Sequence, residues 1–422
     1  MISEMLQSTL FPKTKKDVPK DALSINHQLL VRGGFIDQLM AGSWTLLPLG
    51  WRVISKINQI IRAEMNAIGA QEMLMPLLHP KAIWNETGRW GSSKENPLGA
   101  QEVMYQFRDI RGKEYALSFT HEEIVMDLLR KNIQSFKDLP IAVYHFSTKF
   151  RNEPRARSGI LRGREFMMKD LYSAHTSEHD LMDYYEKVKQ AYSNIFSKLG
   201  FNFKVTEASG GVFTKNRSHE HQVLADSGED TIYYCDACDW SQNKEIFEGQ
   251  EGERCPKCKK GTIIKAKSIE VGNIFPLGTW YAQQMKVYFT DRKGRKEPVW
   301  FGSYGIGPTR TMGAWIEVSH DAKGIIWSPA IAPFMVHLIE LPGEKNIRQT
   351  YQKLQSSGWD VLWDDREVGA GEKFADSDLI GIPVRLVVSQ KTGDRVEWKR
   401  RDSEKTELLS YADVIDRLKK LT

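Results

Sequence analysis

The amino-acid sequence, 422 residues long, predicts an α+β protein with two parts. One stretch alternates in polarity like a half-buried strand, a neighbouring stretch can be its antiparallel partner, and amphipathic stretches around them indicate flanking helices. From about residue 332 the order becomes strand, helix, strand, helix, strand, which is typical of a separate small α/β domain. Hydrophobic residues make up 41% of the chain, which is enough to fill a large core.

The clearest helix is predicted over residues 49–70. Its apolar side chains recur at the helical period, at Val53, Ile54, Ile57, Ile60, Ile61, Met65 and Ile68. Residues 120–133 and 177–200 have the same pattern. The strand-like stretch 71–80 contains Pro76, which predicts an edge or interface position because proline cannot donate a hydrogen bond to a sheet.

The strand pair is predicted at residues 144–151 and 164–172, joined by a loop over 154–163 that contains proline, glycine and serine. In the first strand aromatic side chains alternate with polar ones, which gives one apolar and one polar face. Residues 299–318 indicate a glycine-rich strand that runs into a helix.

Bulk composition excludes several classes of protein. The formal net charge is only +5, too small for a purely electrostatic binder of nucleic acid. No apolar run approaches the roughly 20 residues of a membrane helix, and the first residues lack a secretory apolar stretch. Only four cysteines occur, so a disulfide scaffold is implausible. We expect a cytoplasmic protein without a membrane partner.

Five arginines fall between Arg151 and Arg164. A nucleotide pocket needs fixed cations, an aromatic plane and a carboxylate, and Arg151, Phe166 and Glu153 supply these three groups. The alternative is a solvated hairpin with charged flanks.

A second candidate segment is GSYGIGPTR, residues 302–310, in which Arg310 begins a helix. The segment matches neither the P-loop pattern nor the GxGxxG pattern. A packed strand with a structural arginine is the alternative.

The four cysteines form C-x2-C-x16-C-x2-C, the spacing of a four-cysteine zinc ribbon. The predicted ligands are Cys235, Cys238, Cys255 and Cys258. Four thiolates fill a tetrahedron, so the zinc would be structural. Free thiols or degenerate knuckles are the alternative.

The helix 49–70 leading into the strand with Pro76, then the strand pair with Arg151 and Phe166, then the segment with Arg310 resemble, in this order, motifs 1, 2 and 3 of class II aminoacyl-tRNA synthetases. The finer resemblance is to the bacterial-type prolyl-tRNA synthetase family. The matching stretches are LSFTHEEIV (117–125), TKFRNEPRARSGILRGREFMMKDLYS (148–173), SHEHQVLADSGED (218–230), SIEVGNIFPLGT (268–279), GIIWSPAIAP (324–333) and DDREVGAGEKFADSDLIGIP (364–383). The resemblance implies an antiparallel catalytic sheet flanked by helices, with an anticodon-binding domain behind it in the chain.

By this resemblance, Arg151 holds the ATP α-phosphate and the proline carboxylate, and Glu153 reads the adenine amino group. Phe166 stacks on the adenine, with Arg164 also at the ATP, and Arg310 clamps the distal phosphates of a bent ATP. Arg151 and Arg310 are the expected catalytic residues, through charge and positioning rather than base catalysis.

The resemblance also places Thr120 and Glu122 at the proline imino nitrogen, whose two protons one hydroxyl and one carboxylate can accept. Without the family context the same pair would be a helix N-cap and a first-turn acid. Asn273 stands where the family usually has a histidine of the proline pocket. Glu270 is a possible Mg²⁺ ligand or a surface acid.

The implied domains are a catalytic domain over 1–331 and an anticodon-binding domain over 332–422. Asp365, Arg366 and Lys373 fall in the anticodon region, where a solvated charged face is the alternative. A short cysteine insert over 231–267 stands in place of the editing domain of long bacterial forms. The segment 209–221, with His221 for the usual Phe, is expected to form pocket wall.

The implied partners are L-proline, ATP and tRNA(Pro), a second copy bound through motif 1, and a separate protein that edits mischarged tRNA. The competing hypothesis is a non-catalytic paralogue that binds tRNA. The retained residues Arg151, Glu153 and Arg310 argue against it.

Overall fold

The computed structural model describes residues 4–20, 22–94, 99–156, 158–210, 217–342 and 347–421. Its contacts divide the chain into two compact units. One unit comprises Met40–Ser43 and Asn58–Ala314, and the other comprises Met1–Leu39, Trp44–Ile57 and Trp315–Thr422. The unit with the C-terminal residues therefore also contains the N-terminal segment. The sequence predicts only residues 332–422 for the C-terminal domain.

The first unit is built on a mixed sheet of nine strands among the described residues, in the order β10-β9-β12-β11-β13-β16-β8-β7-β3. Their bounds in chain order are β3 Gln71–Glu72, β7 Ile141–Phe150, β8 Glu165–His175, β9 Phe203–Ala208, β10 Ser218–Leu224, β11 Asp230–Cys235, β12 Ser241–Asn243, β13 Ile263–Gly278 and β16 Trp300–Ile306. The central strands are antiparallel, and the predicted pair β7–β8 is confirmed, with Lys149 opposite Phe166. The predicted α+β class is confirmed as well.

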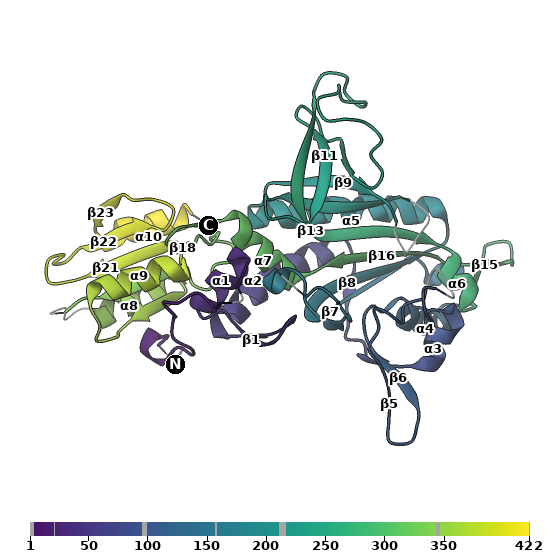
Figure 1. Ribbon diagram of the computed structural model, residues 1–422, viewed down its shortest axis with the longest axis horizontal. Helices are drawn as coiled ribbons and strands as arrows, with labels where there is room; N and C mark the ends of the chain where they lie inside the picture. The colour runs from purple at the N-terminus through teal and green to yellow at the C-terminus, as the bar shows by residue number, and fades with distance from the viewer. Residues whose placement is uncertain are drawn as a thin grey trace. The chain divides into compact units, whose positions relative to one another are not determined.

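Helix α5, Glu178–Leu199, covers one face of this sheet (Figure 1). The Ser177 hydroxyl caps its N-terminus by accepting from the Asp180 amide, and Gly200 ends it at a φ of 94°. The other face packs against α3 Lys81–Thr87, α4 Glu122–Asn132 and α6 Trp280–Gln284, and these helices enclose an apolar core with the sheet.

Strand β7 reverses the burial that its sequence suggests. Its polar side chains His145, Ser147 and Lys149 are buried, whereas Phe146 and Phe150 are only half-buried. An alternating strand usually turns its apolar face to the core. Buried polar side chains need hydrogen-bond partners, so this face of β7 must hold a hydrogen-bond network. The alternating sequence pattern does not predict it.

The predicted first helix is α2, Pro48–Ala67, and the strand-like stretch after it splits in two. Its first piece, β3, pairs only with β7 and lies at the edge of the sheet. Its second piece, β4 Leu78–Pro80, joins β5 Gln106–Arg108 and β6 Glu114–Leu117 in a small separate sheet. Pro76 lies between the two pieces, as its missing N–H predicts.

The second unit contains a five-stranded sheet in the order β20-β19-β21-β22-β23, with β19 and its two neighbours parallel. The elements in chain order are β19 Val336–Glu340, α8 Ile347–Ser356, β20 Val361–Asp364, α9 Ala370–Ile380, β21 Val384–Val388, β22 Val396–Arg400, β23 Thr406–Leu409 and α10 Tyr411–Lys419. The predicted strand–helix alternation is confirmed. Leu6 forms a β-bridge with Trp363 of β20, and the Gln7 side chain lies 2.6 Å from the His337 ring. These contacts tie the N-terminal segment to this sheet.

Candidate active site

A cavity of about 350 Å³ opens on the face of the large sheet that α5 does not cover. Strands β8, β13 and β16 supply much of its lining, because their register brings segments distant in sequence side by side. The sequence-predicted residues in its lining are Thr120, Glu122, Arg151, Glu153, Phe166, Glu270, Asn273 and Arg310. The sheet thus gathers both candidate arginine segments into one pocket.

Arg151 follows the end of β7, and its guanidinium group has no carboxylate within ion-pair distance among the described residues. The group lies 5.4 Å from the centre of the Phe166 ring, and its Nε donates to the Phe119 carbonyl at 3.4 Å. Burial and the nearby charge of Arg310 both lower the pKa of Arg151. An anionic ligand between the two arginines would relieve this repulsion.

Arg310 lies in the first turn of α7, Pro308–Val318. Its Nε donates to the Leu161 carbonyl at 3.0 Å, and its Nη1 lies 3.3 Å from the Glu270 carboxylate. Glu270 also accepts from the Asn273 amide at 2.8 Å. Asn273 and Glu270 therefore share one polar wall of the cavity.

The Glu153 carboxylate lies at the cavity, paired with Arg162 at 2.8 Å. Although burial opposes it, this pairing lowers the pKa of Glu153. Arg164 was predicted at the ATP, but it is not part of the cavity lining. Its Nε donates to the Glu153 carbonyl at 3.0 Å, so its role at the ATP stays a prediction, while Arg162 is the arginine of this pair that lines the cavity. Arg157, another arginine of this segment, lies outside the described residues.

Thr120 and Glu122 meet at the opposite end of the lining. The Thr120 hydroxyl donates to Glu122 Oε2 at 2.6 Å, and the Ser303 hydroxyl donates to Oε1 at 3.0 Å. Arg89 Nη1 lies 3.5 Å from the same carboxylate and 3.0 Å from Glu123. Glu122 is only 1% exposed, so it is a buried acceptor surrounded by donors rather than a solvated first-turn acid.

Sequence reasoning missed Ser303, Arg89 and Tyr172. Ser303 lies within the glycine-rich strand β16, whose small side chains leave the cavity open, and this was the available signal. Arg89 lies outside every stretch singled out from the sequence, so no signal in the sequence pointed to it.

His221, expected in the pocket wall, is buried against α5 instead, with its ring nitrogen 3.2 Å from the Ser193 hydroxyl. Aromatic rings of α5 and β9 surround it, so that prediction is wrong for His221. Residues 211–216 of the same predicted wall lie outside the described residues.

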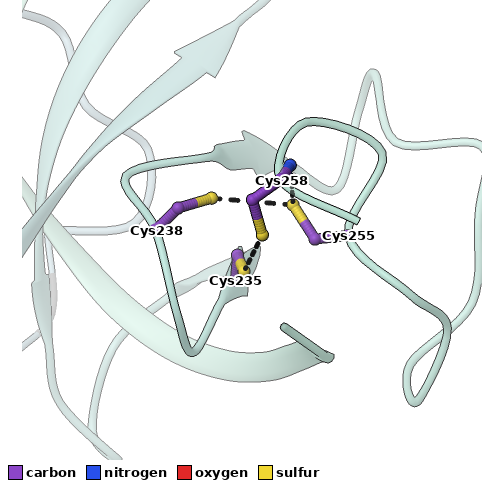
Figure 2. A group of neighbouring side chains, drawn as sticks. All are labelled: Cys235, Cys238, Cys255 and Cys258. Atoms are coloured by element: carbon purple, nitrogen blue, oxygen red, sulfur yellow. Dashed lines mark hydrogen bonds between the residues drawn. The ribbon is translucent and has the colours of Figure 1, made fainter. Parts of the chain in front are cut away.

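The four cysteines converge at the far end of the ribbon formed by β11 and β13 (Figure 2). Their sulfurs all lie within 4.8 Å of one another, with Cys235 and Cys258 3.7 Å apart and Cys238 and Cys255 3.6 Å apart. Tetrahedral zinc with bonds of about 2.3 Å separates its sulfur ligands by about 3.8 Å.

Backbone amides also face the sulfurs. The Gly261 amide donates to Cys258 Sγ at 3.4 Å, and such bonds lower the pKa of Cys258 to about 6. A thiolate at this position suits a metal, so the cysteine set fits the zinc predicted from its spacing.

The predicted anticodon residues are engaged within the second unit. Asp365 accepts from the Ser8 amide at 2.9 Å. Arg366 forms ion pairs of 2.7 Å with Asp364 and with Asp376. Lys373 is 3% exposed, and its ammonium group donates to two backbone carbonyls at the ends of β19 and β20.

The two units correspond to family models. Residues 105–319 match the model described as tRNA synthetase class II core domain (G, H, P, S and T), and residues 337–421 match an anticodon binding domain. The fold and the cavity therefore define a class II aminoacyl-tRNA synthetase.

Sequence comparison identifies the family within this class of synthetases. The chain is 32% identical to a proline–tRNA ligase of Dehalococcoides mccartyi (strain CBDB1), with 98% of each chain covered. It is 33% identical to that of Halothermothrix orenii (strain H 168), with 99% of each covered. The chain belongs to the proline–tRNA ligase family. The first alignment spans 567 positions, more than the 422 residues present here, so the chain fits the short form without the editing insertion.

Solved structures share the fold. A prolyl-tRNA synthetase from Cryptosporidium parvum, complexed with halofuginone and AMPPNP, aligns with a TM-score of 0.77 at 18% identity and covers 94% of this chain and 76% of its own. The Giardia lamblia prolyl-tRNA synthetase in complex with prolyl-adenylate aligns at 0.75, with 17% identity, 94% of this chain and 78% of its own. In the part of the chain that the structure describes, no helix combines the length and apolarity that crossing a bilayer requires.

Proposed function

We propose that the chain activates L-proline with ATP to prolyl-adenylate and pyrophosphate, and then transfers the prolyl group to tRNA(Pro). The observation that carries this proposal is the meeting of Arg151 and Arg310 with the Thr120–Glu122 pair in one cavity. The arginines suit the phosphates, and the buried carboxylate suits a cationic imino group. The family supports the same reaction.

In the first step the proline carboxylate attacks the α-phosphorus and pyrophosphate leaves. Arg151 lies where it can hold the attacking carboxylate and the α-phosphate together, so its main contribution is positioning and charge. Arg310 neutralises the distal phosphates. Phe166 offers its ring to the adenine, and Glu153, already held by Arg162, is placed to accept from the adenine amino group.

Magnesium fits the wall formed by Glu270. Burial and the neighbouring Glu270 charge raise the pKa of Glu220 to about 8, the direction expected where two carboxylates lie near each other. A divalent cation relieves such crowding and, when bound with ATP, offsets the negative charge of the phosphates. Glu270 is the residue that would hold it, beside Arg310.

Proline recognition rests on a two-acceptor site. The secondary ammonium group carries two protons, and Glu122 and Thr120 supply one acceptor each. Met168, Phe275 and Gly305 line the same cavity and can pack on the pyrrolidine ring. Asn273, where the family usually has histidine, borders this region through its bond to Glu270.

Without an editing domain the chain must discriminate at the pocket alone. A pocket separates ligands that differ by a methylene by about 1–3 kcal/mol, so some alanine is activated. We propose that a separate protein clears Ala-tRNA. Robust deacylation of Ala-tRNA by the purified chain would refute this.

Several further assignments belong to the same proposal: a catalytic domain over 1–331 with a zinc-bearing insert over 231–267, an anticodon-binding domain over 332–422, and a cytoplasmic location. Leu74 and Leu78, beside motif 1, are 80% and 50% exposed, which suits burial in a homodimer. The anticodon contacts are assigned to the region of Asp365, Arg366 and Lys373, in which the ion pairs of Arg366 and the Lys373 bonds to the strand ends hold the surface in place.

The direct test is ATP–pyrophosphate exchange with each amino acid in turn. We expect exchange that depends on proline, weaker exchange with alanine, and none with threonine, glycine or histidine. A folded chain without proline-dependent exchange would instead favour the non-catalytic paralogue.

A further inference from the structure

A buried charged network lies directly beneath the proposed imino site. Lys149 is 0% exposed, and its ammonium group lies 2.8 Å from Asp170 Oδ1, 2.7 Å from the Ser147 hydroxyl and 2.8 Å from His121 Nδ1. His145 Nε2 lies 3.1 Å away. None of these groups has a part in the reaction described above.

A metal ion is one conceivable occupant of this network, because His121, His145 and Asp170 bring ligand atoms within 4.8 Å of one another. The Lys149 ammonium group already lies among all three of them. A divalent cation would have to displace this charge. The network therefore carries its own cation, and its function must lie in what Asp170 contacts next.

Asp170 connects the network to the cavity through Tyr172. The Tyr172 hydroxyl donates to Asp170 Oδ2 at 2.7 Å and accepts from the His121 backbone amide at 3.0 Å. Thr120 directly precedes His121 in the chain and lines the same cavity as Tyr172. Burial alone would raise the pKa of Asp170, but Lys149 and the two histidines keep it below its usual range. Asp170 is therefore an anionic acceptor that fixes the Tyr172 proton.

Thr120 can accept a hydrogen bond from proline only if its own hydroxyl proton points to another acceptor. A hydroxyl has one proton to donate and two lone pairs that accept. In the structure Thr120 donates to Glu122. When the imino group arrives, Glu122 must accept from one N–H and Thr120 from the other, so the Thr120 proton needs a different acceptor.

We propose that Lys149, Asp170 and Tyr172 form a relay that turns the Thr120 hydroxyl into an acceptor for the proline imino group. Lys149 holds Asp170 as an anion, Asp170 accepts the hydrogen bond of the Tyr172 hydroxyl, and the Tyr172 oxygen is then free to accept a hydrogen bond from the Thr120 hydroxyl. The three are positioning residues for proline, and this inference rests on the proposed function. No covalent bond changes in the relay.

The test compares proline with tetrahydrofuran-2-carboxylate, in which a ring oxygen replaces the imino group. The variant is Tyr172→Phe, which removes one hydroxyl and keeps the ring stacked on Phe301. We expect KM for proline in pyrophosphate exchange to rise about tenfold, the scale of one lost hydrogen bond, with KM for ATP unchanged. Affinity for the oxygen analogue, measured as an inhibition constant, should fall far less than affinity for proline.

The matched control is Tyr304→Phe. Tyr304 is also a buried tyrosine of this sheet, but its hydroxyl bonds to Ser173 at 2.8 Å and its ring faces α5. We expect no change in the ratio of the two affinities. An equal change in Tyr304→Phe and Tyr172→Phe would overturn the relay, because it would show a general effect on the sheet.

A second variant removes both charges, since Lys149→Met alone would leave Asp170 unpaired and can prevent folding. Lys149→Met/Asp170→Asn should fold and reduce the preference for proline over the oxygen analogue, as Tyr172→Phe does. A folded variant of either kind that keeps the wild-type ratio contradicts the proposal. Failure of the proposed function is distinguishable, because the unaltered chain would then show no proline-dependent exchange.

Discussion

The arginines of the cavity and those of the anticodon region look alike in sequence but differ in their surroundings. Arg151 is half-buried and has no carboxylate within ion-pair distance among the described residues, whereas Arg310 meets Glu270 at one edge of the cavity. Arg366 pairs with Asp364 and Asp376, so its charge is already balanced. A cation that lines a cavity without a balancing carboxylate predicts a ligand, whereas a cation balanced by two carboxylates predicts a structural role.

The largest expected effect concerns the unbalanced arginine. Arg151→Ala should lower kcat/KM for proline-dependent pyrophosphate exchange by about 10²–10³, because a preorganised positive group is lost at the reacting phosphate. Circular dichroism should show the variant folded. Unchanged exchange in a folded Arg151→Ala chain would remove the distinction between the two sets of arginines.

The second prediction concerns the balanced arginine. Arg366→Ala leaves two carboxylates without their shared partner, so we expect the second unit to lose about 3–5 kcal/mol of unfolding free energy in a denaturant titration. KM for proline and ATP in the exchange assay should not change. A drop in exchange as large as that of Arg151→Ala would contradict the comparison.

The cysteine site offers a third kind of charge balance, between thiolates and a metal. We expect about one zinc per chain by elemental analysis of the purified protein, and none in Cys258→Ser, because three thiolates leave the tetrahedron incomplete. A wild-type chain that folds fully without zinc would show that the cysteines act as free thiols.

The last prediction concerns the pH dependence of stability at Glu220. Burial and Glu270 raise the pKa of Glu220 from 4.5 to about 8, so the folded chain holds this proton more tightly than the unfolded chain. Its contribution to stability is therefore present below pH 4.5 and is lost as the pH rises towards 8. Glu220→Gln should flatten the fall in unfolding free energy over this window, measured without added magnesium. An unchanged slope would contradict crowding at the Glu270 wall.

The sequence predicted most of the elements, since α2, α4, α5 and the strand pair follow clear periodicities. Local spacing also predicted the cysteine cluster. Arg151, Glu153 and Phe166 could be predicted together because a hairpin brings them close.

What could not be predicted depends on contacts between distant segments. Thr120, Tyr172 and Ser303 meet only because β8 and β16 pair in one register. The alternation of β7 suggested that its polar face was solvated, whereas Lys149 is fully buried among His121, His145 and Asp170. Arg162 and Arg164 are two positions apart, and only the loop conformation decides which one reaches the cavity.

The most direct measurement is a crystal structure of the chain with a non-hydrolysable prolyl-adenylate analogue. We expect the analogue in the cavity, with its phosphate mimic against Arg151 and its imino nitrogen within hydrogen-bonding distance of Glu122 and Thr120. An analogue bound elsewhere, or one whose imino group faces away from Glu122, would contradict the claim that these buried charges form one site for a nucleotide and an imino acid.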